Sequence, residues 1–345
     1  MRQKKQSVLD LITPTIENKD LGGCDLIIEA VFENMDLKHK VIKETEPHLV
    51  QDGVFASNTS TLPITQLAKA SENPENFIGL HFFSPVDKMP LVEIITGEQT
   101  SDENLAKGFD FARQIKKVPI VVNDSRGFFT SRVFGTFIDE GCRMVKEGLD
   151  PLLVDAMGRQ SGMPVGPLTV HDEISQELIR KVAATNKELD EQFNGNFCSI
   201  NPAMNEMSHV LVKEHQRSGR AFGGGWYDYP QGGDKEIWPK LYDLFYKADA
   251  RISIEDMKDR IIFRQCIESL RCYEEGVFTS VIDGNIGSIM GIGFPSHTGG
   301  VLQYINTYGV KAFTRRAGEL EKAYGKRFAP SKILLDKAKR NELFE

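Results

Sequence analysis

The sequence has no apolar run near the ~20 residues needed to cross a bilayer, which excludes a membrane-spanning helix. It also lacks a dense block of lysine and arginine, and its 42 basic against 49 acidic residues leave a net charge of −7. Because neutralising phosphates requires clustered basic side chains, nucleic acid is excluded as the main partner. The first five residues are partly basic, but no continuous apolar stretch follows them, so we expect no secretory signal.

Cysteine is scarce and scattered. The five cysteines are odd in number and lack CxxC spacing, which favours a reduced cytoplasmic enzyme over a disulfide scaffold or a zinc site. The histidines show no metal-ligand spacing either, so no metal is expected. The sequence also lacks GxSxG, Walker A and HExxH motifs, which excludes the hydrolase, NTPase and zinc-protease classes that these motifs define.

The first third of the chain alternates short apolar runs with amphipathic stretches. Short apolar runs are typical of buried strands, and apolar positions at helical intervals indicate helices. We predict strands at 25–31, 54–56, 77–83, 91–96 and 118–122, and helices at 34–50, 64–70 and 103–116. This alternation predicts an α/β unit whose parallel sheet is covered on both faces.

Parallel sheets bind ligands beyond the carboxyl ends of their strands, so polar residues there are the first candidates. His81 ends one apolar strand and Glu93 lies within the next. Such a histidine is the usual general base, oriented by a carboxylate, although a satisfied buried polar pair is the alternative. The turn at 57–60 could orient a ligand or cap a helix. Glu33 and Lys38 could contact a ligand or form a solvated first helical turn.

After residue 124 the pattern changes to long helical stretches, and an internal repeat occurs. Residues 132–148 read RVFGTFIDEGCRMVKEG, and residues 260–276 read RIIFRQCIESLRCYEEG. An aspartate follows the final glycine of each copy by seven positions, at Asp155 and Asp283. Two copies are too few for a solenoid, which needs about three or more repeats. We therefore expect a duplicated all-α domain whose halves pack together.

Five motifs follow one another between residues 25 and 132, namely DLIIEAVFEN, SNTSTLPIT, GLHFFSP, LVEIITG and SRGFFTSR. In this order they resemble the L-3-hydroxyacyl-CoA dehydrogenase family. The second helical copy, with GIGFPSHTGG, resembles the fused multifunctional proteins of fatty-acid β-oxidation, in which the dehydrogenase follows a hydratase. The resemblance implies a Rossmann-like NAD-binding domain, here truncated, and two copies of a helical C-terminal dehydrogenase domain, with bounds at 1–124, 125–234 and 235–345.

The resemblance also implies a reaction, the oxidation of an L-3-hydroxyacyl-CoA to a 3-oxoacyl-CoA with NAD. His81 matches the general base, Glu93 the acid that orients it, and Ser60 the serine near the substrate hydroxyl. Ser131 matches a position that donates to the thioester carbonyl of the acyl-CoA. The positions that match the cofactor side are Val31, Phe32, Glu33, Lys38, Asn58 and Ser84.

The sequence departs from the family at three places. The family often has asparagine where Ser84 and Ser131 stand. Its members begin with a GxGxxG loop, whose backbone and following helix bind the cofactor pyrophosphate. No GxGxxG occurs in this sequence. We therefore expect the C-terminal part of a larger protein, which binds NAD poorly or not at all.

Two functions remain open at this point. The first is a cytoplasmic NAD-dependent dehydrogenase of fatty-acid β-oxidation. The second is a non-catalytic remnant or module, whose helical part binds acyl-CoA or docks an oxidation partner. The resemblance to fused β-oxidation proteins suggests a thiolase as that partner.

Overall fold

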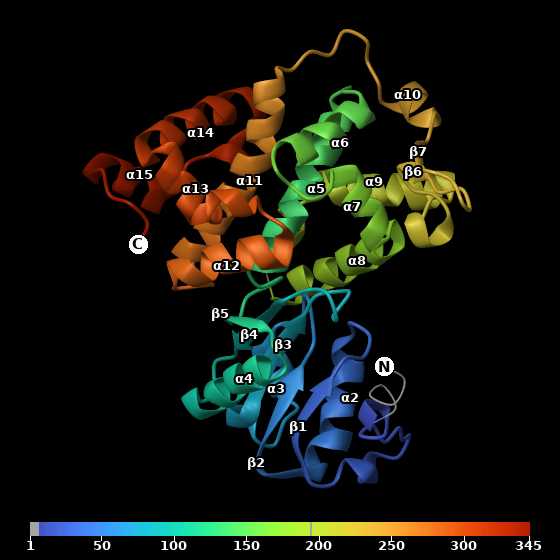
Figure 1. Ribbon diagram of the computed structural model, residues 1–345, viewed down its shortest axis with the longest axis vertical. Coiled ribbons are helices and arrows are strands. Elements are labelled where there is room, and N and C mark those ends of the chain that lie inside the picture. The colour runs from blue at the N-terminus through green and yellow to red at the C-terminus, as the bar shows by residue number, and fades with distance from the viewer. Residues whose placement is uncertain (1–6, 194) are drawn as a thin grey trace.

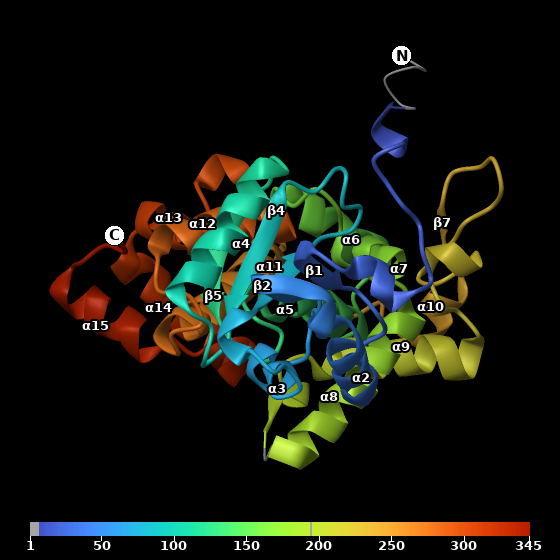
Figure 2. The same ribbon diagram turned by 90° about the horizontal axis from the view of Figure 1, so that it is seen from below.

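The computed structural model describes residues 7–193 and 195–345. It consists of an α/β unit and a larger helical unit stacked on it (Figure 1). Seen from below, the strands of the α/β unit lie in front of the helical unit (Figure 2). The predicted class, α/β followed by all-α, is confirmed.

The α/β unit is built on a sheet with the order β1-β2-β3-β4-β5. Its strands are β1 (Cys24–Glu29), β2 (Leu49–Ser57), β3 (Phe77–Phe82), β4 (Leu91–Thr96) and β5 (Val118–Asn123). Strands β1, β2 and β3 are parallel, as are β4 and β5, whereas β4 runs antiparallel to β3. The prediction of a wholly parallel sheet is therefore corrected at β3–β4. Residues 83–90 are fewer than the dozen or more that a parallel crossover needs.

Three helices accompany these strands, namely α2 (Met35–Thr45), α3 (Ile64–Ala68) and α4 (Asp102–Gln114). The predicted helix at 34–50 is too long, because α2 ends at Thr45 and β2 already begins at Leu49. Pro47 lies between them in a short 3₁₀ turn. Proline lacks a backbone N–H and cannot donate the next hydrogen bond of the helix, which explains the early end.

Side chains of the sheet alternate between two faces. On one face, residues such as Val54 and Ala56 pack with Ala112 of α4. On the other face, Phe55 stacks on Phe77 at 5.5 Å between ring centroids and joins the core that continues into the helical unit. The α/β unit and the helical unit therefore share one continuous hydrophobic core.

The helical unit follows β5. Its first part contains α5 (Thr130–Lys146), α6 (Pro151–Gln160), α7 (Pro167–Ile174), α8 (Gln176–Phe193) and α9 (Pro202–His209). A two-stranded ribbon of β6 (Tyr227–Asp228) and β7 (Glu236–Ile237) leads to α10 (Lys240–Leu244). Its second part contains α11 (Ile254–Glu274), α12 (Val281–Ile292), α13 (Val301–Tyr308), α14 (Val310–Tyr324) and α15 (Lys332–Arg340). Within the described ranges, no helix combines the length and apolarity needed to cross a membrane.

The two copies of the repeat pack against each other through reciprocal ion pairs between α5 and α11. Arg132 Nε lies 2.7 Å from Glu268 Oε1, and Arg260 Nε lies 2.6 Å from Glu140 Oε1. Both pairs join positions related by the same sequence offset, since 132 corresponds to 260 and 140 to 268. The four side chains are buried. Each of the two helices thus supplies the arginine of one ion pair and the glutamate of the other, so the contact has pseudo-twofold symmetry.

Beyond α5 and α11, the sequence offset that relates the two copies of the repeat changes. Asp155 Oδ1 accepts the N–H groups of Leu168 and Thr169 at the start of α7. In the second copy Asn285 Oδ1 does the same at the start of α13. The structural counterpart of Asp155 is therefore Asn285, and not Asp283, because the segment after α11 is two residues longer than its equivalent after α5.

The buried charges make the helical unit sensitive to acid. Burial alone would raise the pKa of Glu268, but Arg264, Arg132 and Arg271 outweigh it and lower the pKa to about 2, from an ordinary 4.5. The unfolded chain therefore takes up this proton first as the pH falls. The stabilising contribution of Glu268 is complete above about pH 4.5 and is lost between about pH 4.5 and 2.

We expect the urea midpoint of unfolding to fall as the pH is lowered from 6 towards 3. In the variant Glu268→Gln this pH dependence should be weaker, because the side chain no longer titrates. Equilibrium unfolding followed by circular dichroism at several pH values measures both slopes. Identical slopes for the two proteins would contradict the pKa assignment.

Candidate active site

Strands β3 and β4 bring the predicted histidine and glutamate together. The antiparallel register places His81 directly opposite Glu93, and His81 Nδ1 lies 2.9 Å from Glu93 Oε2. Both side chains are buried. Since the carboxylate accepts a hydrogen bond, Nδ1 carries the hydrogen and Nε2 is left as the nitrogen that can accept a proton.

The start of α5 holds Glu93 in place. Glu93 Oε1 accepts the backbone N–H groups of Phe129 at 3.0 Å and Thr130 at 3.1 Å. The Thr130 hydroxyl donates to Glu93 Oε2 at 2.6 Å. Helix N-terminal N–H groups favour negative charge, so this fully buried carboxylate is satisfied as an anion. Sequence reasoning missed Thr130, and its place beside Ser131 in SRGFFTSR was the available signal.

The turn after β2 brings Ser60 to the histidine, with Ser60 Oγ 3.1 Å from His81 Nε2. Asn58 fixes this turn to its neighbours. Its Oδ1 accepts the N–H of Phe82 at 3.0 Å, and its own N–H donates to the carbonyl of Glu29 at 2.8 Å. Three separate strand ends therefore position Ser60 relative to His81.

The alternative role of this turn, as the cap of the following helix, is wrong. Helix α3 is preceded by Pro63, which has no side-chain capping bond. The carboxylate of Asp124 performs this role and accepts the N–H groups of Ile64 at 2.9 Å and Thr65 at 2.8 Å. Asp124 lies 60 residues away from Ile64, so no local pattern could reveal the contact.

The loop after β1 is fixed by a buried ion pair. The Lys38 ammonium lies 2.9 Å from both carboxylate oxygens of Glu29 and donates to the carbonyl of Val31 at 3.2 Å. Lys38 is fully buried, so the alternative of a solvated first turn is wrong for this residue. Glu33 is half-buried and accepts the hydroxyl of Thr59 at 2.9 Å. Sequence reasoning missed Glu29, although an acid ending an apolar strand is a visible signal.

The remaining predicted cofactor positions lie at the surface of the same sheet edge. Phe32 is 87% exposed, Ser84 is exposed and Val31 is half-exposed. Ser131 lies in the first turn of α5 and lines the same pocket as Ser60. The predicted cofactor and substrate residues thus lie at one edge of the sheet, and among them Lys38 is fully buried.

The described residues fit one end of NAD. Glu33 in the loop after β1 accepts the N–H of Ser60 at 2.6 Å, and Ser60 Oγ lies 3.1 Å from His81 Nε2, so this loop is linked to the imidazole. Polar groups of this kind suit a nicotinamide. The helix after β1 does not suit a pyrophosphate, because the Asn34 side chain already accepts the N–H of Leu37 at 2.9 Å. Asp36 adds a negative charge to the same turn, and like charges repel there.

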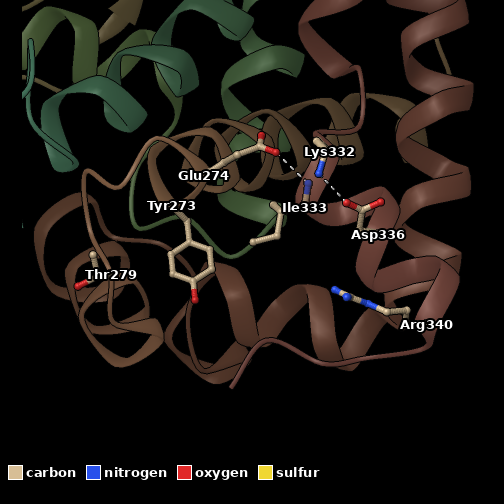
Figure 3. Close-up of a pocket in the computed structure, with 7 residues that line it drawn as sticks. All are labelled: Tyr273, Glu274, Thr279, Lys332, Ile333, Asp336 and Arg340. Carbon is tan, nitrogen blue, oxygen red and sulfur yellow. Dashed lines mark hydrogen bonds and ion pairs between the residues drawn. The ribbon is translucent and has the colours of Figure 1, made fainter.

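A second cavity lies apart from these residues, between the end of α11 and α15 (Figure 3). The carboxylate of Glu274 accepts the N–H of Ile333 at 2.9 Å, and Lys332 pairs with Asp336 at 3.0 Å. The first contact fastens α15 to α11, and the second lies within α15. None of the predicted site residues lines this cavity.

Comparison with known proteins supports the resemblance. The family model described as the NAD binding domain of 3-hydroxyacyl-CoA dehydrogenase matches residues 1–125, and the model of its C-terminal domain matches residues 127–229. The fatty acid oxidation complex subunit alpha of Shewanella amazonensis is 36% identical over 345 residues, which cover 99% of this chain and 48% of that protein. The chain therefore spans about half the length of the curated relatives it matches.

Two solved structures are similar as well. The dehydrogenase part of multifunctional enzyme 1 from C. elegans is 26% identical, with a TM-score of 0.63, covering 92% of this chain and 72% of that one. The (S)-3-hydroxybutyryl-CoA dehydrogenase from Ralstonia eutropha is 34% identical, with a TM-score of 0.59, covering 67% of this chain and 79% of that one. With two matching family models and this relative, the chain belongs to the 3-hydroxyacyl-CoA dehydrogenase family.

Proposed function

We propose that this protein oxidises L-3-hydroxyacyl-CoA to 3-oxoacyl-CoA with NAD, as a dehydrogenase of fatty-acid β-oxidation. The hydrogen-bonded series Ser60, His81 and Glu93 carries the proposal, with distances of 3.1 and 2.9 Å. Removal of a hydroxyl proton needs a positioned base with a free nitrogen, and a buried carboxylate stabilises the charge that the base gains. Family membership supplies the reaction class.

Each side chain then has one task. His81 Nε2 takes the proton of the 3-hydroxyl while the hydrogen on the same carbon leaves as hydride. Ser60 Oγ orients that hydroxyl, and Glu93 stabilises the imidazolium ion that forms. Ser131 donates a hydrogen bond to the thioester carbonyl. NAD, when bound, supplies the hydride acceptor.

The reverse reaction tests this function directly. Acetoacetyl-CoA and millimolar NADH are mixed with the 345-residue chain, and loss of NADH absorbance is followed. The assay is repeated in a chimera, in which the chain replaces the matching half of the Shewanella amazonensis subunit. Turnover in either protein supports the function, whereas a folded chimera without turnover would contradict it.

We expect the 345-residue chain to bind NADH weakly. A family member uses a glycine loop and a helix N-terminus for the pyrophosphate, whereas this sequence lacks GxGxxG and the turn after β1 carries Asp36. Fluorescence titration with NADH should therefore not saturate at micromolar concentrations. Saturation in that range would show that a cofactor site forms without the glycine loop.

The lack of GxGxxG also favours a second candidate function, a non-catalytic module that binds acyl-CoA. The relatives are named as subunits of a fatty acid oxidation complex, and we propose a thiolase as partner, in the cytoplasm. Co-purification of the chain with a thiolase from the same cell would support this assembly. The assembly would be contradicted if the purified chain, mixed with that thiolase, elutes separately from it in gel filtration at all concentrations tested.

A further inference from the structure

One oxygen of the buried Glu93 carboxylate serves two donors at once. Glu93 Oε2 accepts a hydrogen bond from His81 Nδ1 at 2.9 Å and another from the Thr130 hydroxyl at 2.6 Å. We propose that Thr130 is a positioning residue, whose hydroxyl draws part of the negative charge of Glu93 away from His81 and so keeps the imidazole in the form that accepts a proton. The consequence for catalysis rests on the proposed function.

Thr130 is fixed in this position from two sides. Its own N–H donates to the other oxygen of the carboxylate, Glu93 Oε1, at 3.1 Å. On the other side lies α12 of the second copy, where a Cβ on Gly291 would come within 3.1 Å of Thr130 Cγ2. Thr130 is fully buried, so its hydroxyl donates to the carboxylate rather than to solvent. The second copy therefore supports the side chain that contacts the candidate site.

Sharing one oxygen changes how strongly the pair of His81 and Glu93 holds a proton. Each hydrogen bond to a carboxylate stabilises its charged form and weakens its attraction for a further proton. With the Thr130 hydroxyl on Oε2, less negative charge remains to stabilise a protonated imidazole. Because the two groups titrate as a pair, loss of the hydroxyl should strengthen proton binding whether the nitrogen or the oxygen holds the proton.

Other titratable groups approach the pair from three elements. Glu33, in the loop after β1, lines the pocket beside the site. Cys272 of α11 interacts electrostatically with Glu93, and burial raises the pKa of its thiol, which therefore stays neutral. Arg132 of α5 forms its ion pairs with glutamates of the second copy. The part of α12 at 284–292 carries no titratable side chain. Removing the hydroxyl leaves all these groups in place.

NMR titration of the histidine rings in the 345-residue chain tests the proposal without NAD or substrate. His81→Gln identifies the signal of His81. Thr130→Val keeps the shape of the side chain but removes the donor, and it should raise the midpoint of the His81 titration by roughly half a pH unit or more. Thr130→Ser keeps the donor and should restore the midpoint of the unchanged protein.

Thr136→Val is the matched control. Thr136 is a buried threonine of the same helix, and its hydroxyl donates to the carbonyl of Val133 at 2.7 Å. This variant should leave the His81 midpoint unchanged. If Thr130→Val does not fold, Thr130→Ala removes the same donor with a smaller side chain.

Four results would overturn the proposal. They are an unchanged or lower midpoint in Thr130→Val, an equal rise in Thr136→Val, a rise in Thr130→Ser as large as that in Thr130→Val, and a His81 signal that titrates in none of these proteins. Each would show that the hydroxyl does not control the proton of the pair.

The pH profile of the chimera extends the test to catalysis. Oxidation requires the neutral imidazole, so in Thr130→Val its rate should begin to fall at a higher pH as the pH is lowered. Reduction requires the protonated imidazole, so it should persist to a higher pH. Turnover whose profiles do not move in Thr130→Val defeats this inference alone. A shifted titration in a chimera without turnover defeats only the dehydrogenase function.

Discussion

Replacing His81 by glutamine should lower kcat for 3-oxoacyl-CoA reduction by about 100-fold or more, the usual contribution of a general acid or base. Glutamine can donate to Glu93 and keep much of the hydrogen bonding, but its amide cannot exchange a proton with the substrate. The KM for the acyl-CoA should change little, because the pocket that Ser60 and Ser131 line is untouched. Steady-state kinetics of the chimera at saturating NADH, with and without the substitution, measure both parameters.

His39→Gln is the matched control. This histidine lies in α2, and its Nε2 contacts the carbonyl of Gln66 at 3.0 Å, away from the site. Both variants should unfold at similar urea concentrations, since Glu93 keeps its three contacts from the start of α5. A full rate in His81→Gln would remove this histidine from the reaction.

Replacing Glu140 by alanine should lower the free energy of unfolding by about 3–5 kcal/mol, because it leaves buried arginines without their counter-charge. Glu140 is fully buried and accepts Arg260 Nε at 2.6 Å and Arg327 Nε at 2.7 Å. Burial alone would raise the pKa of Glu140, but the two guanidinium groups lower it. Urea unfolding at pH 7 measures the change.

Lys332→Ala is the control for this prediction. Lys332 pairs with Asp336 at 3.0 Å, but its side chain is 85% exposed, and exposed pairs contribute little to stability. Its urea midpoint should match that of the unchanged protein. If Glu140→Ala is as stable as Lys332→Ala, the reciprocal pairs between α5 and α11 do not hold the two copies together.

The structure brings His81 and Glu93 into contact, as the spacing of their strands predicts, and it adds partners that lie elsewhere in the chain. His81 and Glu93 stand at a spacing that two neighbouring strands can bring together. Thr130 and Asp124 were missed because each acts through contacts with a distant segment. For Thr130 the partner carboxylate is 37 residues away, and no periodic pattern connects positions so far apart.

The burial of Lys38 and the direction of β4 were also not predictable from local sequence patterns. Lys38 has the sequence surroundings of a surface helix, yet Glu29 makes its complete burial tolerable, and that pairing depends on where α2 packs. The antiparallel direction of β4 depends on a connection too short for a crossover. That direction alone puts Glu93 opposite His81.

The amino-acid sequence by itself determined the alternation of strands and helices, the duplicated helices and the family, because periodicity and motif order act over short stretches. The tertiary structure decided which charges meet and which are buried. It set the antiparallel β3–β4 register, the hydrogen bonds that hold Glu93 at the start of α5, and the reciprocal arginine–glutamate ion pairs between the copies. These features depend on desolvation and on packing between segments up to 187 residues apart, and neither quantity is local.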